Sequence, residues 1–404
     1  MKNTKIPRNI FISVGMLFAL VQRLAAGATD HVLDWREIPV AVRIITFDAP
    51  EAGTGPQQGT LALAINDVGT IAGYYFDSHP ITHGFVRATD GTITKFDAPG
   101  GGTGPYQGTF TWGMNAVGAI TGDVRDSSDV YHGYLRDPDP NGTFTMFDVP
   151  GAGTGPGQGT VPSDINRYNL IAGYWIDPSN VYHGFVRGWF HGTITSFDVP
   201  GAGTEPGQGT FVNAVDCLND AGSTVGGYID ASNVYHGFVR AVDDTITPLN
   251  APGAGTGPYQ GTQCSGINET GTIVGLYTDT NDVNHGFVRA VDGTFTRVDV
   301  PAAGTDPGQG TLPENINDLG AITGQYVDSN GVNHGFLRTP DGTITASIDA
   351  PGAGTGPNQG TIVGCNNNVN AITGFYVDSN NTWHGFLGLL QPTPRPRPTP
   401  RPRP

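Results

Sequence analysis

The sequence predicts an all-β fold made of many short strands, and three observations lead to this expectation. There are 61 Gly and 31 Pro among 404 residues, while 37% of the residues are hydrophobic. A chain interrupted this often cannot form long helices, yet it holds enough apolar side chains to build a core. The other two observations are a tripeptide that recurs at a nearly constant spacing and hairpin-turn signals that separate runs of β-branched residues.

The recurring tripeptide is His-Gly-Phe, which is once replaced by His-Gly-Tyr. Its seven copies begin at His83, His132, His183, His236, His285, His334 and His384. Successive copies lie about 50 residues apart, and a fixed period of this size indicates a repeat architecture. One structural unit is therefore expected to occur seven times.

Each copy contains four short runs rich in β-branched and aromatic residues, and the fifth copy shows them in order. The first run ends at Asn268, and the second covers 272–277 after an Asn-Glu-Thr-Gly turn. The third covers 285–289, and the fourth covers 294–299 after an Asp-Gly turn. Asn-x-x-Gly and Asp-Gly sequences are strong hairpin signals, so we expect an antiparallel meander.

The only long connector in each copy is the Gly-rich segment that leads into the first run, as in 253–262. Strands about 4.8 Å apart place a fourth strand roughly 14 Å from the first. A connector of this length covers that distance, so the outer strand of one unit can lead to the inner strand of the next. Seven four-stranded units placed radially form a seven-bladed β-propeller.

The two ends of the repeat region predict how such a ring would close. A strand-like segment at 43–50 precedes the first complete copy, and the last copy stops after its third run, near 386–390. Pairing these two segments completes the seventh blade and leaves no bare strand edge. A linear solenoid is the alternative, but it requires capping repeats that the sequence lacks.

The termini carry sorting and spacer signals. Residues 1–28 read as a signal peptide, with a basic start, an apolar run at Ile10–Val21 and small residues before Ala28. The apolar run is shorter than a membrane-spanning helix requires, although an uncleaved anchor is the alternative. We expect a lead-in at 29–42, the β-propeller at 43–390 and a disordered Pro/Thr/Arg-rich tail at 391–404.

The repeated units Ile-Asn-Asp-x-Gly, Gly-Tyr-Tyr-x-Asp and His-Gly-Phe-Val-Arg resemble the HAF-type extracellular repeat of bacterial secreted proteins. The resemblance covers about residues 43–390, although the tripeptide typical of that repeat is His-Ala-Phe. It implies export to the cell surface or the medium and a propeller-like fold. It implies no activity and no catalytic residues.

An Asp precedes each His by six positions. The pairs are Asp77 and His83, Asp126 and His132, Asp177 and His183, Asp230 and His236, Asp279 and His285, Asp328 and His334, and Asp378 and His384. Seven metal sites or acid–base pairs are one interpretation, but a residue present in every unit favours a hydrogen bond that holds the hairpin. No cofactor is assigned. Calcium is left open, because the Asp-rich hairpins offer oxygen ligands without the spacing of a calcium loop.

The turns between the second and third runs and the long connectors of a meander emerge on the same side, which we call the loop-rich face. Aromatic residues at variable positions there are candidate ligand-binding residues, namely Tyr106, Tyr131, Tyr182, Tyr235, Tyr259 and Trp383. Flat rings beside Asn, Asp and Gln suit stacking on sugars. Packing against neighbouring loops is the alternative interpretation.

Acidic residues and cysteines in the first strands are expected near the axis. Asp164, Asp216 and Glu314 are the acids around which an enzyme site would be built, because they break the repeat symmetry. The three cysteines, Cys217, Cys264 and Cys365, are expected in the same strands. Either a Cys217–Cys264 disulfide or three free thiols would fit the sequence.

These observations favour a secreted, non-catalytic binding protein that recognises carbohydrate or a cell-envelope partner through the loop-rich face. The alternatives are an extracellular polysaccharide hydrolase or lyase with an axial site, and a passive structural repeat protein of the surface. Between residues 29 and 390 there are 12 basic and 36 acidic residues, so nucleic acid is not an expected partner. We expect a monomer with no membrane span after removal of the signal peptide.

Overall fold

The structure is a computed structural model that describes residues 40–138, 142–188, 191–212, 216–369 and 371–392. These residues belong to one compact unit and form 28 β-strands. The predicted signal peptide at 1–28, the lead-in as far as residue 39 and the tail from residue 393 lie outside the described residues. The described part of the chain contains no helix able to cross a membrane.

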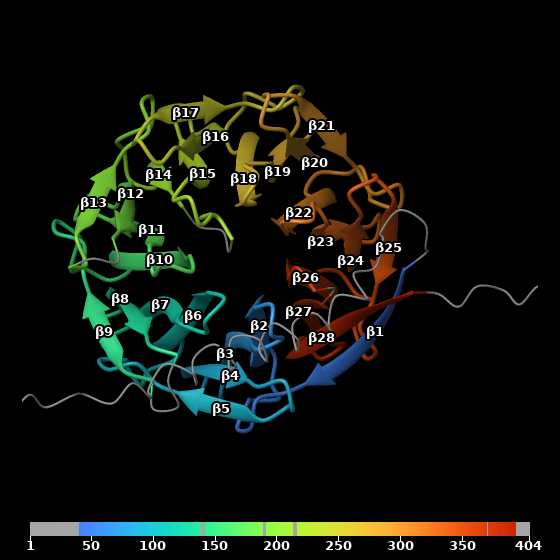
Figure 1. Cartoon of the computed structure of the whole chain (residues 1–404), viewed down its shortest axis with the longest axis horizontal. Helices are drawn as coiled ribbons and strands as arrows, with labels where there is room; N and C mark the ends of the chain where they lie inside the picture. Colours follow the sequence, from blue (N-terminus) through green and yellow to red (C-terminus); the bar gives the residue numbers. More distant parts are fainter. Residues whose placement is uncertain (1–39, 139–141, 189–190, 213–215, 370, 393–404) are drawn as a thin grey trace, which may run out of the picture. The chain divides into compact units, whose positions relative to one another are not determined.

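The strands occur in seven groups of four around a central axis (Figure 1). The first strands, nearest the axis, are β2 (Gly59–Ile65), β6 (Gly108–Met114), β10 (Gly159–Ile165), β14 (Gly209–Phe211), β18 (Gly261–Ile267), β22 (Gly310–Ile316) and β26 (Gly360–Asn366). The second strands are β3 (Ile71–Phe76), β7 (Ile120–Arg125), β11 (Ile171–Ile176), β15 (Thr224–Ile229), β19 (Ile273–Thr278), β23 (Ile322–Val327) and β27 (Ala371–Val377).

The third and outer strands complete the groups. The third strands, which carry the His-Gly tripeptides, are β4 (Thr82–Arg87), β8 (Tyr131–Arg136), β12 (Tyr182–Arg187), β16 (Tyr235–Arg240), β20 (Asn284–Arg289), β24 (Asn333–Arg338) and β28 (Trp383–Pro392). The outer strands are β5 (Ile93–Phe96), β9 (Phe144–Phe147), β13 (Ile194–Phe197), β17 (Ile246–Leu249), β21 (Phe295–Val298), β25 (Ile344–Ile348) and β1 (Val40–Phe47).

The predicted fold class, a seven-bladed β-propeller of separate four-stranded blades, is wrong. Hydrogen bonding does not stop at the boundary of a unit, and all 28 strands form one sheet. The 21 first, second and third strands close into a ring of mixed pairing, and 7 outer strands lie outside it. The physical reason is a parallel pairing between neighbouring units, which a chain of antiparallel hairpins did not predict.

Each parallel pairing joins the first residue of a third strand to the glycine that opens the next first strand. Trp383 pairs in this way with Gly59, and the N–H of Trp383 donates to the carbonyl of Gln58 at 2.8 Å. Gly59 has a φ of 113°, and a Cβ there would collide with the carbonyl oxygen of Trp383. Only glycine combines this backbone conformation with such a close approach.

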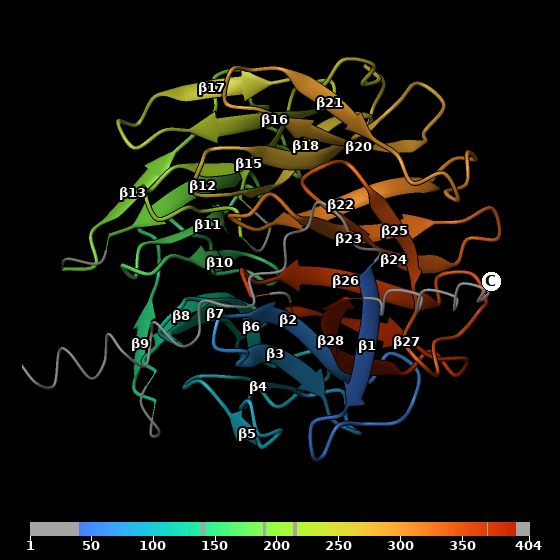
Figure 2. The same cartoon turned by 45° about the vertical axis from the view of Figure 1, so that its right-hand side comes forward.

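The leading strand pairs with the end of the chain's last unit. β1 lies antiparallel to β28, with Phe47 opposite Gly385 and Val42 opposite Leu390. The expected contact between these two segments is therefore present, and β1 serves as the outer strand of the seventh unit (Figure 2). This pairing leaves the last unit with the same number of strands as the others.

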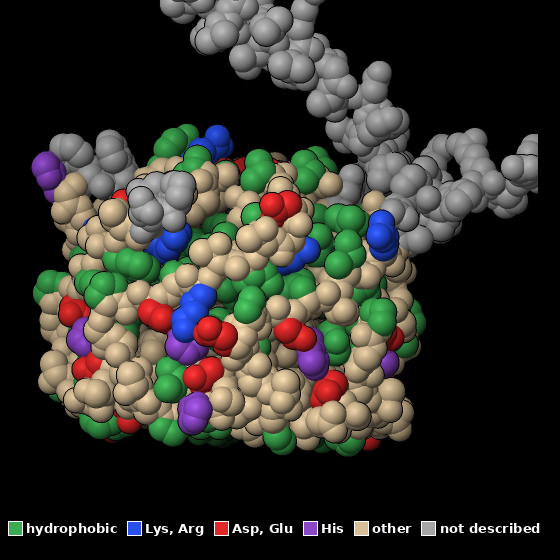
Figure 3. Space-filling model, turned by 90° about the horizontal axis from the view of Figure 1, so that it is seen from below, with side chains coloured by type: hydrophobic (Ala, Val, Ile, Leu, Met, Phe, Trp, Pro, Cys, Tyr) green, Lys and Arg blue, Asp and Glu red, His purple; other side chains and the backbone are tan. Residues whose placement is uncertain are grey.

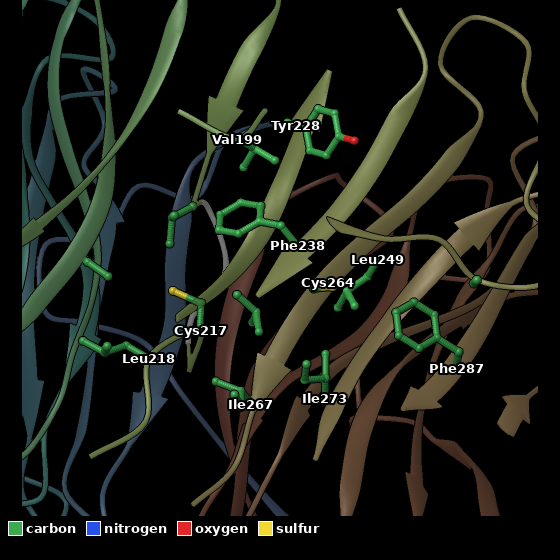
Figure 4. Close-up of a cluster of buried hydrophobic side chains, with 14 of the residues drawn as sticks. Val199, Cys217, Leu218, Tyr228, Phe238, Leu249, Cys264, Ile267, Ile273 and Phe287 are labelled. Atoms are coloured by element: carbon green, nitrogen blue, oxygen red, sulfur yellow. The ribbon is translucent and has the colours of Figure 1, made fainter. Parts of the chain in front are cut away.

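The core consists of apolar layers between neighbouring units. The aromatic residue of each His-Gly-Phe or His-Gly-Tyr tripeptide is at most 1% exposed. Phe238, for example, meets Phe197 of the preceding unit edge-on, with 5.9 Å between ring centroids. Figure 4 shows this layer continuing through Tyr228 and Leu249 to Phe287. Burial of one such side chain contributes about 1.5–3 kcal/mol, so the layers are the main source of stability.

Asparagines in the turns between the first and second strands form hydrogen bonds that join neighbouring units. The Oδ1 of Asn317 accepts the N–H groups of Leu319 (3.1 Å) and Ala321 (2.9 Å), which fixes its own turn. Its Nδ2 donates to the carbonyl of Asn367 in the next unit at 2.9 Å. Six such unit-to-unit bonds have donors Asn115, Asn166, Asn219, Asn268, Asn317 and Asn367. We call these residues, with Asn66 as the last acceptor, the asparagine ring.

We predict that Gly59→Ala destabilises the protein by about 2 kcal/mol or more, because Cβ adds a backbone collision to an unfavourable φ. Urea unfolding of the full chain measures the loss. Gly100→Ala is the matched control, since Gly100 has a φ of 93° but a Cβ there meets no atom within 4 Å. Equal losses in the two variants would contradict the proposed role of the close approach.

Candidate functional site

Each of the seven tripeptide histidines lies between two polar side chains. On the face seen in Figure 3, histidines lie next to acidic side chains. His384 is representative. Its Nε2 lies 3.7 Å from Asp378, the residue six positions earlier, and its Nδ1 lies 3.0 Å from Asp48. The ring also stacks on Tyr376, with centroids 4.8 Å apart. The imidazole is therefore enclosed by neighbours rather than presented to a ligand.

The Asp of each pair is occupied by its own turn. Asp378 Oδ1 accepts the N–H groups of Asn380 (2.8 Å) and Thr382 (2.9 Å). Burial by itself would raise the pKa of Asp378, but these two donors outweigh it and the pKa is lowered. The equivalent turns of Asp77, Asp126, Asp177, Asp230, Asp279 and Asp328 have the same two bonds. This pattern supports a structural role for the pairs.

The closer partner of each His was missed by the sequence analysis. It is the residue that follows the outer strand, and the seven partners are Asp48, Asp97, Asp148, Asp198, Asn250, Asp299 and Asp349. The sequence does carry a signal for these partners, because an acid or amide recurs directly after each fourth run. The signal is weak, since these residues lie 14 to 16 positions beyond the His in the first six units.

The candidate aromatic residues of the loop-rich face are in contact with other side chains. Tyr131 lies under Arg125, with 5.4 Å between the guanidinium carbon and the ring centroid. Tyr182 meets Tyr174 edge-on at 5.8 Å. Tyr235 contacts both Phe211 (6.1 Å) and Tyr259 (6.5 Å). These three tyrosines are half-buried, so one part of each ring packs and another part remains accessible.

Trp383 and Tyr106 belong to a cluster that extends toward the axis. Both rings pack on Phe76, with centroid distances of 5.4 Å for Trp383 and 5.8 Å for Tyr106. The cluster around Phe76 also contains Trp112 and Phe375. Two of the predicted residues of the loop-rich face are therefore connected by packing to side chains near the axis. Tyr259, by contrast, is 67% exposed on its loop.

Two cavities lie along the axis and are lined mainly by the first strands. The smaller, of about 160 Å³, is lined by the asparagine ring, apart from Asn219, and by the acidic residues beside it. The larger, of about 290 Å³, is lined by Leu63, Trp112, Gln263, Cys264, Ser265, Leu276, Glu314, Ile362, Gly364 and Phe375. We call the larger one the axial cavity. It combines aromatic faces with a few polar groups, which is the usual composition of a small-molecule site.

Asp164 and Asp216 come together next to the smaller cavity. Burial raises the pKa of both, and the charge of Asp216 raises that of Asp164 further. Asp164 accepts the N–H groups of Ile165 (2.7 Å) and Leu218 (2.9 Å). Asp216 accepts hydrogen bonds from Asn315 Nδ2 and Cys365 Sγ. Because these bonds already engage both carboxyl groups, the pair is better suited to holding the first strands together than to acid–base catalysis.

Glu314 is separated from this pair and lines the axial cavity. Glu314 is the extra residue of a β-bulge between Pro313 and Asn315, so its side chain lines the axial cavity while Asn315 reaches Asp216. Burial raises the pKa of Glu314 to about 7. No hydrogen bond or ion pair joins its carboxyl group to any described residue. The three axial acids therefore do not form one site.

The indole of Trp112 is held in place by a buried acid. Trp112 Nε1 donates to Asp123 Oδ1 at 2.6 Å, and Asp123 is 2% exposed. Burial raises the pKa of Asp123 to about 7, although the indole N–H opposes this shift. Tyr74 packs against Trp112 at a centroid distance of 5.7 Å. One aromatic wall of the axial cavity is therefore fixed before any ligand arrives.

Neither a metal site nor a disulfide emerges from the described residues. They contain no group of three His, Cys, Asp or Glu side chains arranged to hold a metal ion. Cys217, Cys264 and Cys365 are all buried and free. Of these, Cys264 lines the axial cavity, and burial raises the pKa of its thiol to about 12.

Sequence comparisons find no relative, since no protein-family model matches the chain and no curated protein matches it. Several solved structures are similar in shape. A puromycin hydrolase is 12% identical with a TM-score of 0.46, over 81% of this chain and 53% of the hydrolase. This chain thus spans about half the length of that protein. Function must come from the site itself, because one fold serves many functions.

Two fungal proteins are also similar in shape. AofleA from Arthrobotrys oligospora is 11% identical with a TM-score of 0.41, over 76% of this chain and 90% of AofleA. Aleuria aurantia lectin, in complex with α-methyl-L-fucoside, is 13% identical with a TM-score of 0.34, over 90% of this chain and 99% of the lectin. That lectin is described as a six-bladed β-propeller with a novel mode of fucose recognition.

We predict that the protein is more stable near pH 5 than near pH 8. Glu314 and Asp123 keep protons in the folded state that the unfolded chain has lost, so stability falls as the pH rises from about 4.5 to about 7. The hydrogen bond to Asp48 raises the pKa of His384. Its contribution is complete below about pH 6.5 and is lost as the pH rises through the raised value.

Thermal unfolding at the two pH values measures this difference. Glu314→Gln should raise the unfolding midpoint at pH 8 by about 2 °C or more, since the neutral amide avoids the cost of burying a carboxylate. It should have little effect near pH 5. A midpoint that stays constant or increases from pH 5 to pH 8 would show that these buried groups do not govern stability.

Proposed function

We propose that this is a non-catalytic carbohydrate-binding protein whose ligand occupies the axial cavity. The observation that carries the proposal is the lining of that cavity. The rings of Trp112 and Phe375 share one space with the polar side chains of Gln263, Ser265 and Glu314. Rings stack on the apolar faces of sugars, while amide, hydroxyl and carboxyl groups hydrogen-bond to their hydroxyls.

The size of the cavity limits the ligand. A volume of about 290 Å³ lies at the lower end of the range for small-molecule sites. It suits one or two sugar rings rather than a long segment of polymer. A chain end or a branch of a larger glycan is therefore the expected form of the ligand.

The loop-rich face supplies the second part of the proposal. Trp383 and Tyr106 reach the cavity lining through Phe76, so a longer glycan bound at the axis would continue over these rings. Tyr131, Tyr182 and Tyr235 remain candidate contacts through their accessible parts. We place the protein outside the cytoplasm on the signal-like residues 1–28, and a carbohydrate of the cell envelope or the surroundings is the matching partner.

We predict that Gly364→Leu abolishes glycan binding without unfolding the protein. Gly364 lines the axial cavity, has no unusual backbone conformation, and a Cβ there meets no atom within 4 Å. The leucine side chain therefore has room to enter the cavity and fill it. A glycan array followed by calorimetry with the glycans that bind measures the loss, and circular dichroism checks the fold. Unchanged affinity in the folded variant would place the ligand elsewhere.

Two further variants distinguish binding in the axial cavity from binding at the loop-rich face. Trp112→Ala should weaken binding about tenfold or more, because a stacking ring contributes about 1–2 kcal/mol. Tyr168→Ala is the matched control, since Tyr168 is a 56% exposed aromatic residue in a first turn. The triple alanine variant of Tyr131, Tyr182 and Tyr235 reports on the loop-rich face. Loss of binding in the triple variant alone would show that the ligand binds at the loop-rich face and not in the axial cavity.

A further inference from the structure

The axial cavity contains an acidic side chain but no basic one among its described lining residues. Within that part of the lining, Glu314 is the only acidic residue, and no Lys, Arg or His is present. Glu314 is half-buried at the cavity wall, and its carboxyl group has no hydrogen-bonding or ionic partner among the described residues. A carboxyl group left in this state is available to a ligand that supplies the missing donor.

Gln325 is a second acceptor without a donor in the same unit, although it does not line the cavity. It lies opposite Leu312 in β23, the position that Leu276 and Phe375 hold in the units on either side. Leu276 and Phe375 both line the axial cavity. Within the described structure the buried Oε1 of Gln325 has no hydrogen-bond partner. Two acceptors without donors thus occur in the sixth unit, one of them on the cavity wall.

The aromatic wall also favours positive charge. The faces of Trp112 and Phe375 carry the negative part of a ring quadrupole, which attracts a cation. The whole chain has a net charge of −16, so the surrounding field attracts cations as well. The unpartnered carboxyl group of Glu314, the aromatic faces and the lack of a basic side chain among the described lining residues all favour a ligand that is a cation and a hydrogen-bond donor.

We infer that the ligand of the axial cavity carries a protonated amino group, as in an amino sugar, and that this ammonium group pairs with the carboxylate of Glu314. This inference rests on the proposed carbohydrate-binding function and specifies its ligand class. An ammonium group brings up to three donors and one positive charge. It would satisfy Glu314 and leave donors for neighbouring acceptors, whereas a neutral hydroxyl group brings a single donor.

The titratable groups near Glu314 determine how binding depends on pH. Burial raises the pKa of Glu314 to about 7 and that of the lining thiol of Cys264 to about 12. Asp123 lies behind Trp112, and Asp216 lies beyond Asn315. Below the pKa of Glu314, protons compete with the ammonium group for its carboxylate. Affinity for an amine should therefore rise about tenfold per pH unit up to that value, while the amine stays protonated.

The test compares three β-1,4-linked disaccharides of glucosamine, N-acetylglucosamine and glucose, measured by calorimetry with the full-length chain. The glucosamine disaccharide should bind at least tenfold more tightly than the other two at about pH 6.5, and should lose most of this advantage at about pH 5. Glu314→Gln should remove both the preference for the amine and its pH dependence, because the neutral amide carries no charge to pair with the ammonium group. Asp318→Asn is the matched control, because Asp318 is an acid of the same unit that lines the smaller cavity.

The outcomes separate this inference from the proposed function. Equal affinity for all three disaccharides, abolished by Gly364→Leu, would overturn the inference and leave carbohydrate binding in place. A preference for the amine that persists in a folded Glu314→Gln variant would also overturn it. Failure of every disaccharide and every array glycan to bind would overturn both. Circular dichroism and unfolding midpoints of each variant show that the protein measured is folded.

Discussion

The close parallel approach at one glycine per unit determines how the seven units fit together. At each junction the backbone N–H that precedes the His reaches the carbonyl next to that glycine, as Trp383 does to Gln58 at 2.8 Å. A side chain at Gly59 would prevent this contact. The junction holds the start of every first strand against the third strand of the neighbouring unit, and the first strands enclose the axis (Figure 1). The apolar layers and the axial cavity both follow from that arrangement.

Much of this fold could be predicted from local patterns, because a meander is specified by its turns. The Asn-x-x-Gly turns and the four runs of each copy follow from residues close to one another in the sequence. The pairing of the leading strand with the last unit follows from the order of runs in the repeat, since the last copy lacks the run that the leading strand supplies. The junction between units could not be predicted in the same way. It consists of a single residue pair with no length or periodicity of its own, so the units were expected to be separate blades.

The site was less accessible to prediction, since it depends on the direction of individual side chains. Asp164 and Glu314 lie one position apart in the repeat, at a β-bulge of the first strands, and they line different cavities. Asp216 comes close to Asp164 only because the fourth unit departs from the pattern of the repeat. There β14 is short, and Asp216 itself has a φ of 62°. Trp112 gave no signal in the sequence, because its role depends on Asp123 of the neighbouring strand.

The asparagine ring also bears on what happens when the backbone is broken. Its amide bonds run in one sense around the axis, and the bond from Asn367 to Asn66 joins residues 301 positions apart in the same way as the bonds between successive units. In the third to seventh units the ring asparagine thus bonds to the neighbouring units on both sides, independently of the covalent chain. Cleavage by a protease in a connecting loop between these units would leave the amide bonds on both sides intact, so a nicked molecule should remain assembled.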